Sequence, residues 1–386
     1  MARIASFEIL AVDLPFKKPF KHAAAERASS YSLFVRCETD TGATGFGESL
    51  PREYVTGESR EGAVGMLRDR ILPNLVGRGF DSQDEVRAFL HECDGKVPAG
   101  WVDPDEPQTA AWGAVDLALL DAFGREFGQP ALASDSAGFP EGVRYSGVLS
   151  SDTGWKLIKT ALKMRLFGLR SIKMKIEGET TEETLRAARR ALGRRTDIRV
   201  DANMAWSVDD AIETMKTMSR YGIRSFEQPV DPADLDGLAR LVRETGLGIM
   251  ADESLNDGDS LRRLIDRRAC TAVNVRISKC GGLIGALNRC RDALRAGLQV
   301  QIGCQVGESS LLSSAHLALV AAVRDVTYAE GLFGLRLLRE DPVSPMLHFG
   351  YGGRAPSRPD GPGLGVTVDE SILRSHAIGR ETIGPR

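Results

Sequence analysis

The sequence lacks long apolar runs. Nowhere in its 386 residues does an uninterrupted apolar stretch approach the roughly 18 residues that indicate a membrane-spanning helix. The first ten residues, MARIASFEIL, also lack the apolar core of about 7–15 residues that marks a secretory signal. We therefore expect a soluble, cytoplasmic protein with no membrane partner.

Cysteine and histidine are too sparsely arranged to build a disulfide framework or a zinc site. The six cysteines include no Cys-x-x-Cys pair, and none of the five histidines belongs to a ligand pair, so reduced thiols are expected. Cys280 and Cys304 lack the partner histidine that would activate a nucleophilic thiol. His316 lies on the apolar face of a helical pattern and is expected in the core.

A large excess of charge of one sign is absent as well. The net charge of −3 gives no electrostatic reason to expect nucleic acid or an anionic membrane as a partner. No heptads, low-complexity tracts or linkers interrupt the chain. A chain of this length and ordinary composition has room for two domains, and the expected partner is a small molecule.

The N-terminal part of the sequence favours an α+β domain. Its pattern predicts strands at 4–13, 31–39 and 41–48, then helices at about 60–76, 84–93 and 108–127. A helix stop, Gly128-Gln-Pro130, follows the last of these. We predict a first domain over residues 1–130, a barrel over 131–335 and a C-terminal segment over 336–386.

The middle of the chain repeats one unit, a short apolar run that ends in a charged residue. From Lys175 the next such residues are Asp201, Glu227, Asp252 and Lys279, at intervals of 26, 26, 25 and 27 residues. A strand, a helix and two turns fill about that length, since a (β/α)8 barrel takes roughly 250 residues for eight units. Strands are expected near residues 144, 172, 198, 224, 248, 272, 298 and 326. The sequence therefore predicts the α/β class and a (β/α)8 TIM-like barrel.

The charges at these strand ends predict a metal site flanked by lysines. Three carboxylates from adjacent strands would repel one another without a counter-ion, and an oxygen-seeking divalent cation such as Mg²⁺ resolves the conflict. A lysine becomes a base near neutral pH if its pKa falls to about 7–8 through burial or a neighbouring cation. Lys173, two residues before Lys175 on the same strand, points to the same side and supplies that cation.

Each of these motifs also has an ordinary structural explanation. Asp201-Ala-Asn203 and Asp252-Glu-Ser254 could cap helices, and Glu227-Gln-Pro229 could be a surface turn. Five independent turns would not keep a regular interval with the charge always at the carboxyl end of the strand. In barrels that end carries the chemistry, so the combined pattern favours an active site.

Lys173-x-Lys175, Asp201-x-Asn203, Glu227, Asp252 and Lys279 resemble the signature of the enolase superfamily. The likeness is to its muconate lactonizing subgroup, within the mandelate racemase/muconate lactonizing enzyme family, and it extends over nearly the whole chain. It implies one Mg²⁺ (or Mn²⁺) on the three carboxylates with Asn203 behind them, and catalytic roles for the three lysines. It also implies a homo-oligomer, an N-terminal capping domain over the barrel mouth, and a C-terminal segment, including Gly361–Gly365, that returns to the cap.

In this family two cap loops contact the substrate, and here they would be about residues 15–29 and 50–57. Candidate substrate-binding residues are then Lys21, His22, Arg52, Tyr54 and, after the seventh strand, Glu308. Glu308 could equally cap the following helix, and Glu330 is either at the barrel rim or only a strand end.

The resemblance implies removal of the α-proton of a carboxylate substrate through a metal-stabilised enediolate. Lys175 would act on one face and Lys279 on the other, giving racemisation or epimerisation, or cycloisomerisation; dehydration by an acid dehydratase is the alternative. Dipeptide epimerases of the subgroup carry an Asp-x-Asp after the eighth strand, which Ala329–Gly334 lacks, so that assignment is disfavoured. A Schiff-base aldolase and a non-catalytic binding relative are less favoured hypotheses.

Overall fold

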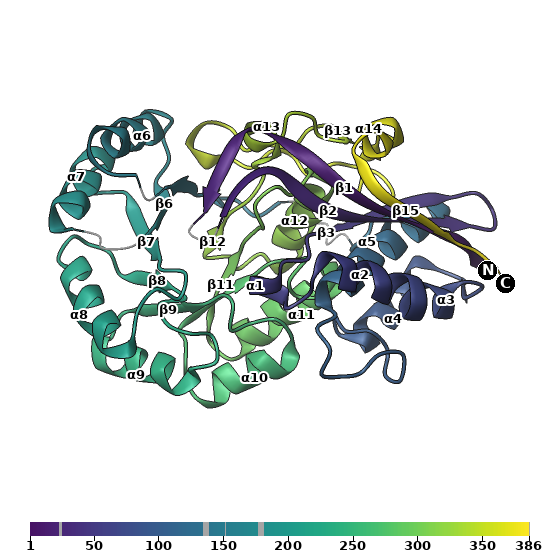
Figure 1. Ribbon diagram of the computed structural model, residues 1–386, viewed down its shortest axis with the longest axis horizontal. Coiled ribbons are helices and arrows are strands. Elements are labelled where there is room, and N and C mark those ends of the chain that lie inside the picture. Colours follow the sequence, from purple (N-terminus) through teal and green to yellow (C-terminus); the bar gives the residue numbers. More distant parts are fainter. Residues whose placement is uncertain (23–24, 134–138, 151, 177–180, 386) are drawn as a thin grey trace.

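The computed structural model describes residues 1–22, 25–133, 139–150, 152–176 and 181–385, with the side chains of residues 20–26 outside that description. Two bodies lie side by side in Figure 1, an N-terminal sheet with its helices at the right and a parallel sheet ringed by helices at the left. Both chain ends lie at the right-hand side. Among the described residues, none of the helices combines the length and apolarity needed to cross a membrane.

The N-terminal body is an antiparallel sheet covered by helices. Its strands run in the order β15-β1-β2-β3, with the short β4 (Gly79–Phe80) also paired to β1. Their bounds are β1 Ala2–His22, β2 Ala25–Thr39, β3 Thr44–Ser49 and β15 Ala377–Ile383. Because β15 pairs with β1, the C-terminal segment does return to the N-terminal sheet, as predicted.

The helices of this body follow the predicted pattern. They are α1 Glu53–Thr56, α2 Arg60–Met66, the π-helical turn η1 Leu67–Ile71, α3 Leu72–Leu75, α4 Gln83–Cys93 and α5 Thr109–Glu126. α5 is buried over nearly its whole length, since it lies between β3 on one side and the barrel helix α11 (Gly282–Arg295) on the other. It therefore joins the two bodies through one shared apolar core.

The segment predicted as a loop over residues 15–29 is instead the far end of a hairpin. β1 and β2 stay paired as far as His22 and Ala25, with one register shift between Pro15 and Phe20. Pro19 lies in that irregular stretch, where the proline nitrogen has no hydrogen to donate to a partner strand. The resemblance implied a cap loop here, but antiparallel pairing continues past the interruption as far as His22 and Ala25.

The second body is a parallel eight-stranded sheet in the order β12-β11-β10-β9-β8-β7-β6-β5. The strands are β5 Gly147–Leu149, β6 Ser171–Lys175, β7 Asp197–Asp201, β8 Ser225–Glu227, β9 Gly248–Ala251, β10 Ala272–Val275, β11 Gln299–Ile302 and β12 Tyr328–Ala329. A parallel bridge between Tyr145 and Ala329 joins the two edges of the sheet. The predicted α/β class and eight-stranded barrel are confirmed.

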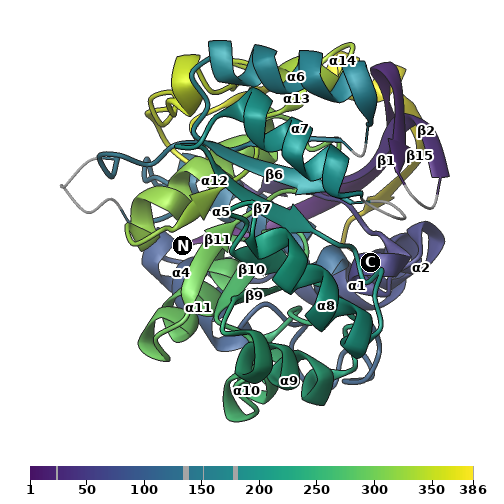
Figure 2. The same ribbon diagram turned by 90° about the vertical axis from the view of Figure 1, so that its left-hand side faces the viewer.

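A helix follows each of the first seven barrel strands. They are α6 Gly154–Leu166, α7 Glu182–Leu192, α8 Val208–Ser219, α9 Leu235–Thr245, α10 Gly258–Asp266, α11, and α12 Ser310–Val323. Short polar residues start several of them; the Ser207 side chain, for example, accepts a hydrogen bond from the Asp210 N–H at the start of α8. Figure 2 shows α6 to α10 on the outer surface of the barrel. His316, in α12, is buried against Tyr145, as predicted.

The C-terminal segment consists of short elements that link the barrel to the N-terminal sheet. They are α13 Gly334–Leu337, β13 Val343–Ser344, the 3-10 turn η2 Tyr351–Gly353, β14 Thr367–Val368 and α14 Glu370–Ser375. Leu338 forms a bridge with Phe16 of β1, so the segment also holds the hairpin end of β1. The exact division at residues 130 and 335 stays a prediction.

Gly281, just before α11, packs tightly against Gly95 of the N-terminal body. Its φ of 76° is left-handed, and a Cβ built on it would lie 1.8 Å from the carbonyl oxygen of Gly95. Gly281→Ala should destabilise the fold by about 3 kcal/mol or more, because backbone must move to make room. Gly297→Ala is the matched control, since Gly297 has a φ of 80° and nothing within 4 Å of the position that a Cβ would occupy.

Chemical denaturation of the two glycine variants tests this packing. The control should lose only about 1–2 kcal/mol, the cost of a left-handed alanine. Equal unfolding midpoints for Gly281→Ala and Gly297→Ala would contradict the proposed steric role of Gly281.

Candidate active site

Three of the predicted residues form a row at the carboxyl end of the barrel sheet. Lys175 is the register partner of Asp201 on β7, and Asp201 is the register partner of Glu227 on β8. Asp252 follows the last residue of β9, the next strand. Because the strands are parallel and adjacent, residues far apart in sequence meet at one rim.

Lys173 lies at the centre of this carboxylate cluster. Its Nζ is 2.9 Å from Glu227 Oε1, 3.0 Å from Asp201 Oδ2 and 3.5 Å from Glu330 Oε1. Burial alone would lower the pKa of Lys173, but the three carboxylates outweigh burial and raise the pKa above its ordinary value. Lys173 therefore carries a positive charge, and Lys175 Nζ lies 3.9 Å from Asp201 Oδ2 beside it.

Asp252 is held from the other side of the cluster by two cations. Lys279 Nζ donates to the backbone oxygen of Asp252 at 2.5 Å and to its Oδ1 at 2.7 Å. Arg276 forms an ion pair with Asp252 Oδ2 and lies 3.7 Å from Glu227 Oε1. Burial, with Arg276 nearby, lowers the pKa of Lys279 to about 7, although Cys280 and two glutamates act in the opposite direction.

Amide side chains fix the carboxylates in place. Asn203 Nδ2 donates to Asp201 Oδ1 at 2.7 Å, and Asn274 Nδ2 donates to Glu227 Oε1 at 2.8 Å. Glu227 has a pKa of about 2, because the charges of Lys173 and Arg276 outweigh the effect of its burial. Glu227 is thus ionised, and hydrogen bonds orient both Asp201 and Glu227.

The donor set is chemically suited to Mg²⁺, which prefers carboxylate oxygens. No group of three or more carboxylate, histidine or cysteine side chains within the described ranges is already spaced to hold a metal ion. Lys173 lies between Asp201 and Glu227 and pairs with both, and Arg276 pairs with Oδ2 of Asp252. A divalent cation bound to these carboxylates would therefore replace cations of the chain itself.

A cavity of about 290 Å³ opens beside the cluster. Its polar wall includes Lys173, Lys175, Asp201, Asn203, Glu253, Arg276 and Glu330. Its apolar wall comes from Met164, Leu169 and α13, with Tyr54 of α1 reaching in from the N-terminal body. Lys279, with none of its side chain exposed, is not among the residues that line it. The cavity is large enough for a small carboxylic acid.

The predicted substrate-binding residues do not all lie at the cavity. Tyr54 lines the cavity and is 44% exposed. Arg52 is buried and donates to the backbone oxygens of Tyr31 and Pro51, so it serves the packing of the N-terminal body. Glu308 accepts a hydrogen bond from the Gln305 N–H at 2.6 Å and lies outside the cavity lining. The side chains of Lys21 and His22 lie outside the described residues.

Sequence reasoning missed Arg276, Glu253 and Asn274, and left Glu330 undecided. Asn274 and Arg276 are at or just beyond the end of β10, two residues apart, so the alternation that placed Lys173 with Lys175 could have found them. Glu330 pairs with Lys173 and also with Arg199, 2.9 Å away inside the barrel. The Arg199–Glu330 ion pair joins β7 to the end of β12, and no pattern in the local sequence predicts it.

Two family descriptions match most of the chain. Residues 5–133 match "Mandelate racemase / muconate lactonizing enzyme, N-terminal domain", and residues 156–372 match "Enolase C-terminal domain-like". The N-succinyl-L-Arg/Lys racemase of Bacillus cereus is 27% identical over 384 residues, covering 99% of this chain and all of the relative. Its crystal structure superposes with a TM-score of 0.84 over the same shares of both chains.

Two further relatives are named for other reactions, a cycloisomerisation and an epimerisation. Muconate cycloisomerase 1 of Rhodococcus opacus is 26% identical over 379 residues, 96% of this chain and 98% of that protein. The dipeptide epimerase of Cytophaga hutchinsonii, solved with Mg and the dipeptide D-Ala-L-Val, has a TM-score of 0.82 and 26% identity, covering 99% of this chain and 100% of the other. The relatives thus include racemases, epimerases and cycloisomerases, all of which are isomerases.

Proposed function

Because this chain belongs to the mandelate racemase/muconate lactonizing enzyme family and is an isomerase, we propose that it removes the α-proton of a small carboxylic acid. The observation that carries the proposal is the row Lys175–Asp201–Glu227 in strand register, with Lys279 on the far side of the carboxylates. Racemisation or epimerisation is the favoured outcome, and cycloisomerisation is the second.

Asp201, Glu227 and Asp252 would hold one Mg²⁺, or Mn²⁺ in its place, with Asn203 orienting Asp201 from behind. Bound there, the ion would stabilise the second negative charge that develops on the substrate carboxylate when the α-proton leaves. The solved relative with bound Mg supports this choice of ion.

The side chains of the chain account for the proton transfers. Lys175 lines the cavity and would accept the α-proton at its Nζ. Lys173, which still faces Glu330 when a metal takes Asp201 and Glu227, would keep positive potential beside Lys175. Lys279 would return a proton to the opposite face once its contacts to Asp252 loosen. Arg276 lines the cavity and could pair with a second anionic group of the substrate.

The surroundings of Glu330 favour a substrate without a free ammonium group. Glu330 already pairs with Lys173 and Arg199, so its charge is compensated within the barrel. A free α-ammonium would meet Lys173, Lys175 and Arg276 in the same cavity. N-acylated amino acids and α-hydroxy acids avoid that repulsion, whereas dipeptides with a free N-terminus do not. The name of the Bacillus cereus relative, a racemase of N-succinyl amino acids, agrees with this class.

Deuterium exchange tests the function without knowledge of the product. N-succinyl amino acids, α-hydroxy acids and free dipeptides would be incubated with the enzyme in D₂O, with Mg²⁺ or after chelation, and followed by ¹H NMR. We expect loss of the α-proton signal from the first two classes only, and only with metal. Exchange that survives complete metal removal would contradict the metal assignment. Trapping of a lysine–substrate adduct by borohydride would instead indicate a Schiff-base enzyme.

A further inference from the structure

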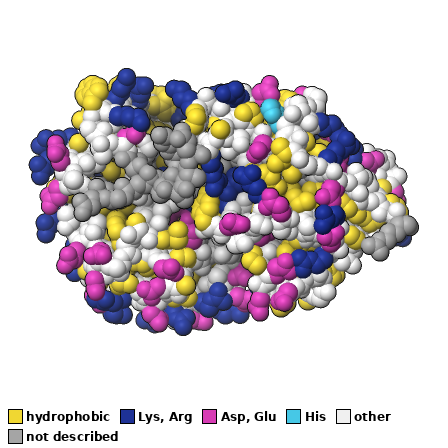
Figure 3. Space-filling view, in the orientation of Figure 1, with side chains coloured by type: hydrophobic (Ala, Val, Ile, Leu, Met, Phe, Trp, Pro, Cys, Tyr) yellow, Lys and Arg dark blue, Asp and Glu magenta, His cyan; other side chains and the backbone are white. Residues whose placement is uncertain are grey.

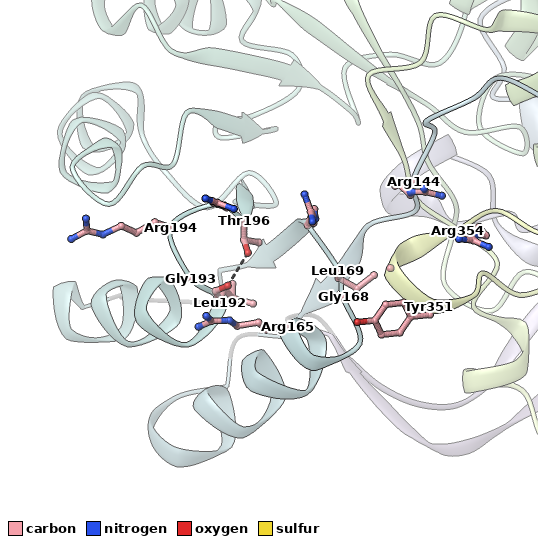
Figure 4. Close-up of a pocket in the computed structure, with 13 residues that line it drawn as sticks. Arg144, Arg165, Gly168, Leu169, Leu192, Gly193, Arg194, Thr196, Tyr351 and Arg354 are labelled. Carbon is pink, nitrogen blue, oxygen red and sulfur yellow. Dashed lines mark hydrogen bonds between the residues drawn. The ribbon is translucent and has the colours of Figure 1, made fainter.

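A second and larger cavity, of about 850 Å³, lies at the opposite end of the barrel. Its walls are the turns that precede β6 and β7, the chain just before β5, and the 3-10 turn η2 of the C-terminal segment. Six of its thirteen lining residues are arginines: Arg144, Arg165, Arg170, Arg194, Arg195 and Arg354. In Figure 4, Arg144 and Arg354 lie at one end and Arg165 and Arg194 at the other.

The positive charge of this arginine pocket is uncompensated within the described part of the chain. All six arginines are exposed, no Asp or Glu lines the cavity, and none of the six forms an ion pair with a described carboxylate. Other exposed arginines do have such partners, for example Arg262 with Asp259 and Arg295 with Asp292. On the face in Figure 3, acidic and basic side chains are interspersed. A cavity lined by one sign of charge concentrates counter-ions.

The backbone enforces part of this charge concentration. Arg144 and Arg354 are direct partners in an antiparallel bridge, an arrangement that destabilises a sheet when both residues carry the same charge. The bridge is closed by the hydrogen bond from the Tyr145 N–H to the Gly353 oxygen, at 2.7 Å. The fold therefore places two arginines directly opposite each other on paired backbone, an arrangement that a bound anion would stabilise.

An aromatic ring completes the cavity. Tyr351 is 71% exposed and lies over Gly168, where a Cβ would come within 2.9 Å of the ring. The absence of a side chain at Gly168 lets the ring reach the turn before β6. An exposed ring among guanidinium groups is a surface on which a flat base can stack.

We propose that the arginine pocket binds a small molecule carrying a chain of two or more phosphate groups. The guanidinium group is planar, always charged, and pairs with phosphate through two parallel hydrogen bonds. Several arginines spread over one cavity match several linked phosphates better than a single carboxylate. The proposal concerns a separate cavity and does not depend on the proposed function of the carboxylate cluster.

Calorimetric titration with inorganic tripolyphosphate tests the proposal on the full-length protein in metal-free buffer. We expect saturable binding that weakens as salt increases, because exposed charges are screened. Arg144→Gln with Arg354→Gln should weaken binding by about tenfold or more, since two charged donors to phosphate are lost. The control, Arg262→Gln with Arg295→Gln, removes the same charge from exposed arginines outside the cavity and should bind as the parent does.

Thermal unfolding separates loss of a site from loss of the fold. At about 1 mM tripolyphosphate the parent should gain in Tm, and the Arg144/Arg354 double variant should lose that gain while its ligand-free Tm stays the same or rises. ATP serves as the second probe. If Tyr351→Ala loses ATP affinity but binds tripolyphosphate as the parent does, the ligand is a nucleotide. If Tyr351→Ala and the parent bind ATP equally well, the pocket recognises the phosphate chain alone. No saturable binding by either probe would overturn the proposal. Equal weakening in the control variant would also overturn it.

Discussion

Asp201→Asn should reduce α-proton exchange by about a thousandfold or more, because it removes a charge that acts at the reacting centre. One oxygen of Asp201 accepts a hydrogen bond from Asn203, and the other lies 3.0 Å from Lys173 Nζ and 3.9 Å from Lys175 Nζ. Asparagine keeps the size of the side chain but offers a divalent cation only one neutral amide oxygen. The loss should appear both in exchange rate and in Mg²⁺ affinity measured by calorimetry.

The fold should survive this substitution. Lys173 keeps Glu227 at 2.9 Å and Glu330 at 3.5 Å, so its buried charge stays compensated. Asp197→Asn is the matched control, because Asp197 begins the same strand at its exposed end, away from the cavity. Full exchange by Asp201→Asn, or an equal defect in Asp197→Asn, would contradict the role assigned to Asp201.

Replacing Lys175 or Lys279 should each abolish proton exchange on one face of the substrate only. For a racemisable substrate, Lys175→Ala should lose exchange of one enantiomer and Lys279→Ala exchange of the other, each by about 10²–10⁴-fold. The reason is that Lys175 lies beside Asp201 on one side of the carboxylates, whereas Lys279 contacts Asp252 on the other. Proton NMR of each pure enantiomer in D₂O measures the two rates separately.

Lys279 needs a second measurement, since it also holds Asp252 through two hydrogen bonds. A purely structural role would reduce exchange of both enantiomers and Mg²⁺ affinity together. Lys156→Ala, which removes an exposed lysine from α6, controls for the loss of one positive charge. Equal residual exchange of both enantiomers in Lys175→Ala and Lys279→Ala would mean that these lysines do not act on opposite faces.

The barrel could be predicted from the sequence because its signal is local. Each strand is a short apolar run, and runs such as Ser171–Lys175 and Asp197–Asp201 end in the charged residue that marks the rim. The regular interval fixes the order of the strands, and parallel strands in register then bring Lys175 next to Asp201. Strand order and side-chain alternation are therefore enough to assemble the candidate site.

The contacts within that site could not be predicted, because they depend on how the barrel closes. Nothing near Glu330 in the sequence indicates Arg199 or Lys173 as its partners. Arg52 was expected to face substrate because the resembling family has a substrate-contacting loop at about residues 50–57. Instead, Arg52 is buried and donates hydrogen bonds to the backbone oxygens of Tyr31 and Pro51. The arginine pocket gathers side chains from four separate segments, and each segment alone reads as ordinary solvated surface.

The ion pairs between the carboxylate cluster and the chain's own cations determine how the protein can be handled in the laboratory. Asp201 and Glu227 both pair with Lys173, and Asp252 pairs with Arg276 and Lys279, without any added ion. If the proposed metal binds, its removal with a chelator would not leave three bare negative charges in the interior. One batch can then be loaded with Mg²⁺, Mn²⁺, Ca²⁺ or a luminescent lanthanide in turn. Each ion would compete with the same lysine and arginine side chains, so the resulting series would compare ions of different charge, size and hydration at one site.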